Sequence, residues 1–275
     1  MTTSGISHAE AIGTAFDEMG ELVEIQGGSN HIGYWYSEDD DAPFLEAINQ
    51  CTNVVGEKLQ LKPGQRLLDI GCGVAQPAVR YAQRYDVHIT GITNSRWQVE
   101  EAGRRTKAGG VGSQITIDYG DAAALPYPDD SFDAVLSFQS LQHAEDRGQW
   151  LREMARVVRP DGRVVLVDFI EEIPLAENEV EILFGNNVPM ERPLPFAEVV
   201  DQVRESGLEV AEALSCGDRI RRSYPAYWER VAHIKSHLNA TLGAERIADH
   251  LGFMNIMLPI YHDKIGYVII TAQKA

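Results

Sequence analysis

Two glycines close the end of a predicted buried strand in the segment "LLDIGCGVAQPA", residues 67–78. Such a strand–turn–helix unit aims backbone N–H groups and a helix N-terminus at a ligand, so it can hold a dinucleotide, another nucleoside cofactor or nothing. A dinucleotide site is expected to show GxGxxG and an acidic residue about 20 positions further on. Here Gly71 and Gly73 are followed by Gln76 in place of the third glycine, and the next strand ends in "GITNS", residues 91–95, without a carboxylate. Both halves of the dinucleotide pattern are therefore degraded.

A histidine and an aspartate follow later strands of the same predicted sheet. His143 comes after one strand in "SLQHAED", and Asp168 ends the next in "LVDF". Ligands bind at the carboxyl ends of strands in open α/β sheets, so both side chains are expected at one mouth. A hydroxyl nucleophile needs a base, and histidine is the usual base near neutral pH. We predict His143 as that base, with Asp168 orienting the imidazole or the substrate; the alternative is a histidine that is only structural.

Two other groups have the residue types of a metal site, but no metal is predicted. His233 and His237 are four residues apart on a predicted helix, yet no third zinc ligand is marked. Asp168, Glu171 and Glu172 could gather a magnesium ion. Neither pattern is specific enough to carry a prediction.

The sequence predicts alternating strands and helices, and these elements must position the glycine turn, His143 and Asp168. Helices are expected over 8–26 and 43–60, and short apolar strands alternate with helices from residue 65 onward. This pattern predicts βαβ units in a doubly wound α/β fold with a parallel sheet covered on both faces. The expected strands are 66–70, 87–92, 115–119, 132–138 and 164–169, and the helices between them are 75–85, 95–108 and 147–158.

The pattern changes after residue 170. Residues 171–194 contain three prolines and no clean period, and 224–258 are rich in aromatic residues and methionine and are expected to be helical. A helix over 196–206 and strands over 207–215 and 266–272 complete the predicted elements. Two irregular apolar insertions near one end of a sheet favour a cap over a pocket; the alternative is that they only complete the core.

Composition narrows the classes of partner. The 275 residues carry a net charge of −17, which repels phosphate backbones, so no nucleic-acid partner is expected. Three widely spaced cysteines argue against a disulfide framework and fit a cytoplasmic location. No signal peptide and no apolar segment of about 18 residues is recognised, so no membrane association is expected.

Three segments in order carry a resemblance: "DIGCG" at 69–73, "GDAAALPYPDDSFDAVLSFQSLQH" at 120–143 and "LREMARVVRPDGRVVLVDF" at 151–169. Their succession resembles the class I S-adenosylmethionine-dependent methyltransferases, well over 64–170 and loosely elsewhere. Within that family the chain is similar to small-molecule enzymes of natural-product pathways, such as sugar O-methyltransferases of the rebeccamycin type. The "NHIGYW" stretch at 30–35 is similar to a segment before the core of such enzymes. The resemblance implies S-adenosylmethionine as cofactor and a Rossmann-like, seven-stranded sheet.

The resemblance also implies a division of the chain into an N-terminal helical lid (1–62), a cofactor-binding core (63–170) and a remainder with substrate-cap insertions (171–275). Neutral residues stand where the family has an acidic residue for the ribose, namely Thr93 and Asn94, with Gln98 nearby. Asp121 is implied to meet the adenine, or alternatively to cap a helix over 122–124. The implied cofactor contacts are Asp69, Gly71, Cys72, Gly73, Thr93, Asn94, Gln98, Asp121, Ala122, Phe138 and Gln139.

Aromatic residues outside the core are expected to meet the acceptor. His31, Tyr34 and Trp35 form the predicted lid, with Tyr34 and Trp35 facing inward over the cofactor. Tyr227 and Trp228 are expected at the substrate, on a helix that could equally be plain core. A homodimer is one further expectation.

The leading interpretation is methylation of a hydroxyl on a bulky small molecule in secondary metabolism, for example in antibiotic biosynthesis. Methylation at nitrogen or carbon is the first alternative. A scaffold that binds the cofactor and steers a cyclisation without methyl transfer is the second, because a fold does not fix a function. A nicotinamide-dependent oxidoreductase is a more distant one.

Overall fold

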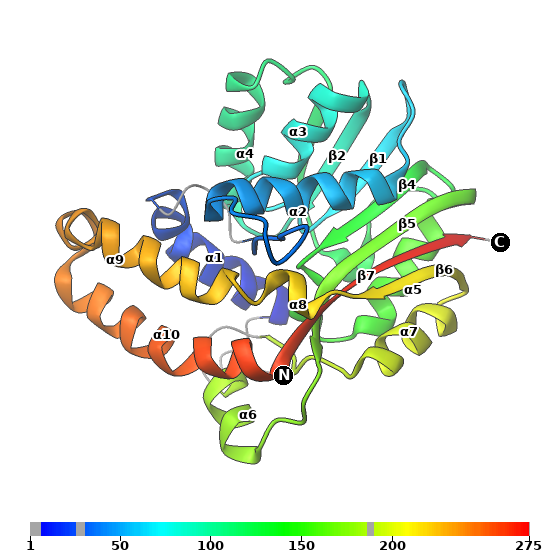
Figure 1. Ribbon diagram of the computed structural model, residues 1–275. Coiled ribbons are helices and arrows are strands. Elements are labelled where there is room, and N and C mark those ends of the chain that lie inside the picture. Colours follow the sequence, from blue (N-terminus) through cyan, green and yellow to red (C-terminus); the bar gives the residue numbers. More distant parts are fainter. Residues whose placement is uncertain (1–6, 26–30, 186–189, 275) are drawn as a thin grey trace.

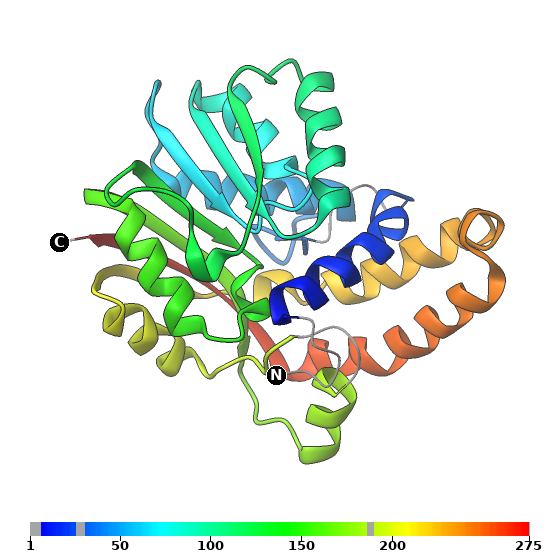
Figure 2. The same ribbon diagram turned by 180° about the vertical axis from the view of Figure 1, so that it is seen from behind.

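The computed structural model describes residues 7–25, 31–185 and 190–274. Seven strands form one sheet in the order β3-β2-β1-β4-β5-β7-β6, with helices on both of its faces (Figures 1 and 2). This architecture confirms the predicted α/β fold. The strands are β1 (Arg66–Ile70), β2 (His88–Thr93), β3 (Ile115–Tyr119), β4 (Phe132–Phe138), β5 (Val158–Glu171), β6 (Leu208–Ser215) and β7 (Ile265–Lys274).

The sheet is mixed rather than wholly parallel. Strands β1 to β5 pair in parallel, as predicted, but β7 runs antiparallel to both β5 and β6. Ile265 at the start of β7 pairs with Glu171 at the end of β5, so β7 starts at the end of the sheet where β5 finishes. The chain crosses back once, through α7, to form β6, which therefore runs in the same direction as β5. After β6 no further crossover precedes β7, so β7 starts at the end of the sheet where β6 stops and runs antiparallel to both neighbours.

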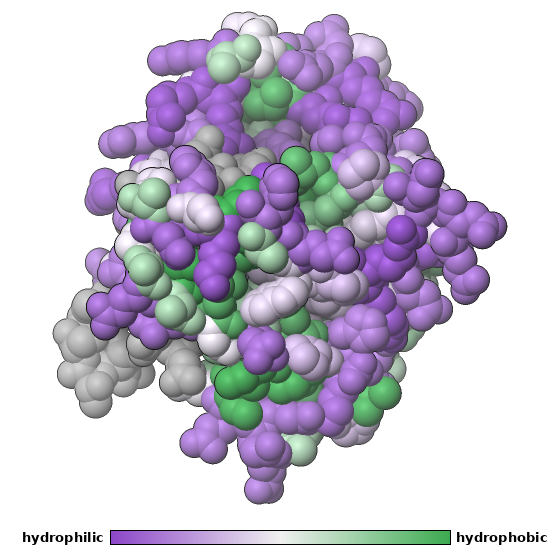
Figure 3. Space-filling view, turned by 60° about the vertical axis from the view of Figure 1, so that its left-hand side comes forward, coloured by the Kyte–Doolittle hydropathy of each residue, from purple (hydrophilic) through white to green (hydrophobic). Residues whose placement is uncertain are grey.

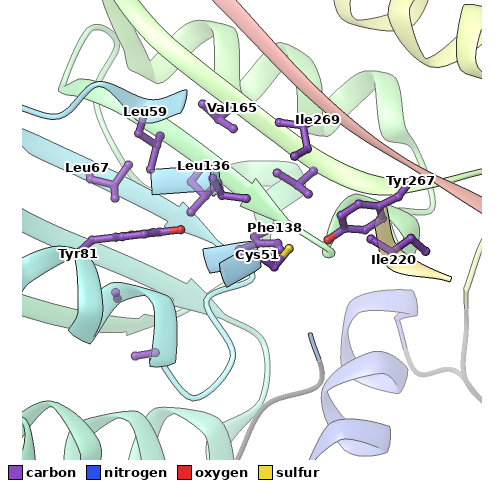
Figure 4. Close-up of a cluster of buried hydrophobic side chains, with 14 of the residues drawn as sticks. Cys51, Leu59, Leu67, Tyr81, Leu136, Phe138, Val165, Ile220, Tyr267 and Ile269 are labelled. Carbon is purple, nitrogen blue, oxygen red and sulfur yellow. The ribbon is translucent and has the colours of Figure 1, made fainter. Parts of the chain in front are cut away.

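Helices cover the sheet because successive strand residues point to opposite faces. Leu67 and Leu136 belong to the core cluster on one face, which also takes the apolar sides of α2 (Phe44–Leu59), α3 (Gln76–Tyr85) and α4 (Arg96–Ala108). Figure 4 shows this cluster, with Leu59 and Tyr81 reaching it from two helices. Leu68 and its neighbours on the other face pack against α5 (Arg147–Val157) and α7 (Phe196–Glu205).

The remaining helices gather near the carboxyl ends of the parallel strands. The first, α1 (His8–Ile25), contacts both α4 and α9 (Ser223–Leu242), and α9 forms a hairpin with α10 (Ala244–Lys264). Residue 26 at the predicted end of the first helix and residue 30 of "NHIGYW" lie outside the described residues. Two short elements, α6 (Glu177–Phe184) and α8 (Gly217–Ile220), complete this side.

Sequence analysis was inaccurate mainly in this last part. The stretch 224–258 is helical as expected, but it is divided between two helices at Gly243, which adopts a φ of 89°, and the second helix continues to Lys264. Helix α6 lies in the proline-containing stretch where no period was recognised. On the side where α9 and α10 come forward, apolar side chains lie exposed among polar ones (Figure 3), and Trp228, Phe253 and Ile256 are among the exposed apolar residues.

Candidate active site

A cavity of about 490 Å³ lies at the carboxyl ends of the parallel strands. One part of its wall comes from the segments that follow β1 to β4, and another from α1, α9 and α10. The lining residues that sequence analysis assigned to the cofactor are Gly71, Cys72, Gly73, Thr93, Asn94, Gln98, Ala122, Phe138 and Gln139. The cavity therefore brings together most of the predicted cofactor residues.

The turn after β1 is tight, and its two glycines have different roles. Gly71 has a φ of +70°, and a Cβ there would lie 2.4 Å from the Cβ of Ser140. The backbone N–H groups of Gly71 and Cys72 both donate to the carbonyl of Ile92, at 2.9 and 3.1 Å. Gly73 has a φ of +54° with nothing within 4 Å of an added Cβ, so it faces open space. Packing thus explains Gly71, whereas Gly73 leaves room for a ligand against the backbone.

Asp69 lies beneath this turn and is not among the residues that line the cavity. Its side chain is buried, and burial raises the pKa of the carboxyl to about 7. A direct cofactor contact by Asp69 stays a prediction.

Neutral polar groups end β2, as the sequence predicted. The hydroxyl of Thr93 donates to Gln98 Oε1 at 2.5 Å, and Asn94 Nδ2 donates to the carbonyl of Ala9 in α1 at 2.8 Å. The amide of Asn94 is therefore anchored to the N-terminal helix while the residue lines the cavity. Hydrogen bonds from a ribose to these residues stay predicted.

Asp121 caps a short 3-10 helix, η1 (Ala122–Ala124). Its Oδ1 accepts from the backbone N–H of Ala123 at 2.9 Å, and the residue is exposed. Its neighbours Gly120 and Ala122 line the cavity, but Asp121 does not. The capping alternative is thus realised, and an additional contact with adenine stays a prediction.

The segment after β4 meets the N-terminal segment. The ring of His31 stacks on Phe138 with the centroids 4.0 Å apart, and the side chain of Gln139 accepts from the backbone of Ile32 at 3.4 Å. Gln139 itself has a φ of 54°. Burial lowers the pKa of His31 to about 4, so this imidazole is neutral at physiological pH.

His143 ends a second 3-10 helix, η2 (Leu141–His143), and its buried side chain lines the cavity. Asp168 reaches this turn through the backbone, since its two oxygens accept from the N–H groups of Gln142 (3.0 Å) and Phe169 (2.8 Å). Burial raises the pKa of Asp168 to about 6. Because Asp168 does not line the cavity, it is placed to hold the turn of His143 rather than to touch an acceptor.

Two of the predicted aromatic lid residues are elsewhere. Trp35 is buried with its Nε1 donating to Ala42 O at 2.9 Å and the guanidinium of Arg222 over its ring, and Tyr34 packs on the core. Neither lines the cavity, whereas His31 and Ile32 of the same segment do. That Tyr34 and Trp35 face the bound cofactor stays a prediction.

Helix α9 contributes one of its two predicted substrate residues. Tyr227 lines the cavity, and its hydroxyl lies 3.0 Å from Nε2 of His250. Trp228 is exposed and does not line the cavity, because the next residue on a helix is turned by about 100°.

Sequence analysis placed the first helix in an N-terminal lid but named none of its residues as part of the site. Ile12 and Phe16 line the cavity, and the ring of Phe16 meets that of His143 edge-on at 5.2 Å. The signal was available, since residues at i and i+4 share one face of a helix. Within residues 7–25, 31–185 and 190–274, no group of three or more potential metal ligands gathers. In the same ranges, no helix combines the length and apolarity needed to cross a membrane.

Comparisons with known proteins identify the family of this chain. A family described as "Methyltransferase domain" matches residues 68–166. The chain is 35% identical to 27-O-demethylrifamycin SV methyltransferase of Amycolatopsis mediterranei (strain S699) over 266 residues, which cover 96% of each protein. The chain is an S-adenosylmethionine-dependent methyltransferase. S-adenosylmethionine is its cofactor. The open space beside Gly73, in the wall of the cavity, is compatible with a cofactor lying against the backbone of this turn.

Other relatives of this methyltransferase agree in fold and family. It is 33% identical to methyltransferase GfsG of Streptomyces halstedii over 268 residues, covering 96% of this chain and 94% of that protein. Among solved structures it is similar to the [4+2]-cyclase SpnF, with a TM-score of 0.84, 28% identity and coverage of 97% of this chain and 96% of that one. The more specific similarity to rebeccamycin-type sugar methyltransferases stays a prediction.

Proposed function

We propose that this methyltransferase transfers a methyl group to a hydroxyl of a bulky, largely apolar small molecule of secondary metabolism. The observation that carries the proposal is that His143 lines the same cavity as the glycine turn. A group able to accept a proton thus shares one chamber with the cofactor turn.

The rest of the wall indicates what the acceptor is like. Apolar and aromatic side chains dominate the part of the wall that the end of β5, α6 and the C-terminal helices build: Phe169, Leu183, Tyr224, Met254, Met257, Leu258 and Tyr261. Pockets of several hundred Å³ with such walls suit drug-sized molecules, and methionines adapt to irregular shapes. A bulky apolar body with few polar groups fits this chamber best.

S-adenosylmethionine supplies an electrophilic methyl group when bound. The chain's own residues have two tasks, to align the acceptor hydroxyl and to take its proton as the new bond forms. His143 is assigned the proton. Asp168 holds the backbone of the preceding residue, Gln142, and so positions the imidazole.

A labelled-methyl assay tests the proposal. The protein is incubated with methyl-labelled S-adenosylmethionine and a panel of hydroxylated natural products that includes 27-O-demethylrifamycin SV, the compound for which a relative is named. We expect label on an oxygen of at least one compound, located by NMR. Label on nitrogen or carbon alone would replace the proposal with the corresponding alternative.

One observation favours a second candidate. The similarity to a [4+2]-cyclase at 28% identity supports a protein that binds the cofactor and rearranges its substrate without methyl transfer. This candidate predicts product formation with no label incorporated, and equal product with S-adenosylhomocysteine in place of the methyl donor.

A further inference from the structure

One face of α1 lies against the loop that follows β2. Ala9, Gly13, Asp17 and Gly20 recur at helical spacing and form this face. A Cβ on Gly13 would lie 2.1 Å from the carbonyl oxygen of Asn94, and one on Gly20 would lie 2.5 Å from the ring of Trp97. Helix α1 is therefore in direct contact with the loop at Asn94 and, two helical turns further along, with the first turn of α4 at Trp97.

Asp17 joins this face to the first turn of α4. Its Oδ1 accepts from the hydroxyl of Ser95 at 2.5 Å and from the backbone N–H of Trp97 at 3.1 Å. Ser95 is the N-cap of α4, and its hydroxyl oxygen accepts from the backbone of Gln98 at 3.0 Å. Asp17 thus completes the cap of one helix from another, with a negative charge at the end where the helix dipole favours it.

The capped loop belongs to the cofactor side of the cavity. Thr93, Asn94, Trp97 and Gln98 all line it, as do Ile12 and Phe16 from the neighbouring face of α1. Asn94 is tied to α1 by its bond to Ala9. The helix therefore forms the wall next to the loop that ends β2.

The same helix also contacts the turn of the candidate base. Nε2 of His8 lies 3.0 Å from the carbonyl oxygen of His143, and Phe16 packs edge-on against the His143 ring. At its other end, Arg246 of α10 donates to the carbonyl of Glu18. Figures 1 and 2 show α1 lying between α4 and the α9–α10 hairpin.

We propose that Asp17 is the positioning residue through which α1 closes over the cofactor, so that cofactor release requires Asp17 to leave the Ser95–Trp97 turn. The polar ties at this face are few and partly exposed, so they can break and re-form without unfolding the core. The proposal concerns cofactor retention and is independent of which atom is methylated.

The test compares Asp17→Ala with Glu18→Ala. Both remove one negative charge and place alanine in the same helix, but only the first removes the cap. Tritiated S-adenosylmethionine is bound to each protein and chased with unlabelled cofactor. We expect dissociation about five times faster in Asp17→Ala, the factor that corresponds to a cap of about 1 kcal/mol. Glu18→Ala should match the wild type, and Asp17→Asn should recover most of the retention because asparagine caps as well as aspartate.

Hydrogen exchange gives a second measurement that a merely structural cap would not move. Added S-adenosylhomocysteine should protect amides of α1 in the wild type, and this protection should be smaller in Asp17→Ala. A lower melting temperature of Asp17→Ala with a wild-type dissociation rate would overturn the proposal. Equal acceleration in Glu18→Ala would overturn it as well, since charge rather than the cap would then be responsible. Failure of O-methylation leaves both measurements intact.

Discussion

The carboxylate of Asp168 holds the backbone that leads to His143, with Oδ2 accepting from Gln142 N at 3.0 Å. Its other oxygen accepts from Phe169 at the end of its own strand. The aspartate therefore connects β5 to the η2 turn, and it influences the candidate base through the backbone. This arrangement separates the roles of the two residues and makes them testable one by one.

Replacing His143 with alanine should lower turnover while leaving cofactor affinity within about twofold. A positioned base is typically worth about 10²–10⁴-fold, because the hydroxyl needs a group that takes its proton. Steady-state rates with the acceptor found in the labelled-methyl assay measure the loss. The exposed His88, at the start of β2, provides the matched control as His88→Ala. A nearly full rate in His143→Ala would remove the base from the mechanism.

Asp168→Asn should cost less turnover than His143→Ala and should also destabilise the fold. Asparagine presents an NH₂ group to one of the two backbone N–H donors, and a buried donor without an acceptor costs about 1–3 kcal/mol. The double variant should be non-additive in turnover, because Asp168 acts through the turn of His143. Additive losses in a full cycle of turnover measurements would show that the two residues act separately.

Substitutions of the two glycines in the turn after β1 should affect different properties, stability at Gly71 and cofactor affinity at Gly73. Gly71→Ala, or the larger Gly71→Val, should lower the melting temperature, since the added carbon meets Ser140 at 2.4 Å and φ is positive. Gly73→Ala meets nothing in the fold, so it should lower cofactor affinity with a smaller loss of stability, although its φ is also positive. Calorimetric titration with S-adenosylhomocysteine and thermal melts distinguish the two effects. Wild-type affinity in a folded Gly73→Ala variant would contradict cofactor binding at this turn.

Asp121→Asn tests whether the η1 cap also meets the adenine. The substitution preserves an acceptor for Ala123 but exchanges the second oxygen for a donor, so a weaker affinity for the cofactor is expected. Asp146, whose Oδ1 caps α5 by accepting from Gln149 at 2.8 Å, provides a control as Asp146→Asn. If Asp121→Asn changes melting temperature but not affinity, Asp121 is a cap and nothing more.

Local signals allowed the core of the fold to be predicted, because glycine turns and short apolar strands depend on neighbours in sequence. The observed β1, β3 and β4 have the predicted bounds. The direction of β7 depends on where the chain re-enters the sheet, which no local pattern records.

The candidate site was likewise predictable where it depends on neighbours in sequence and not where it depends on distant contacts. The turn at Gly71 was recognisable, whereas the roles of Trp35 and Asp17 depend on partners far away in sequence, Arg222 and Ser95. From the sequence alone, an aromatic residue near a glycine, such as Trp35, could face either the cavity or the protein core. In the non-helical segment 31–35, tertiary packing alone decides which residues face the cavity.

Asp69 should make the cofactor-free protein less stable as the pH rises. Burial raises the pKa of its carboxyl to about 7 in the folded chain, whereas an unfolded aspartate titrates near 4. Between the unfolded pKa near 4 and the folded pKa of about 7, the folded protein keeps a proton on Asp69 that the unfolded chain has lost. The stability that the neutral carboxyl contributes is therefore fully present below about pH 4 and is lost as the pH rises through 7. Asp69→Asn keeps a neutral group of similar shape at every pH. Its melting temperature should therefore equal that of the wild type near pH 4 and exceed it near pH 8. The control variant Asp249→Asn, at an exposed site, should show no such pH-dependent difference from the wild type. If the melting temperatures of wild type and Asp69→Asn instead differ by the same amount at every pH in this range, the buried carboxyl is charged in the folded protein.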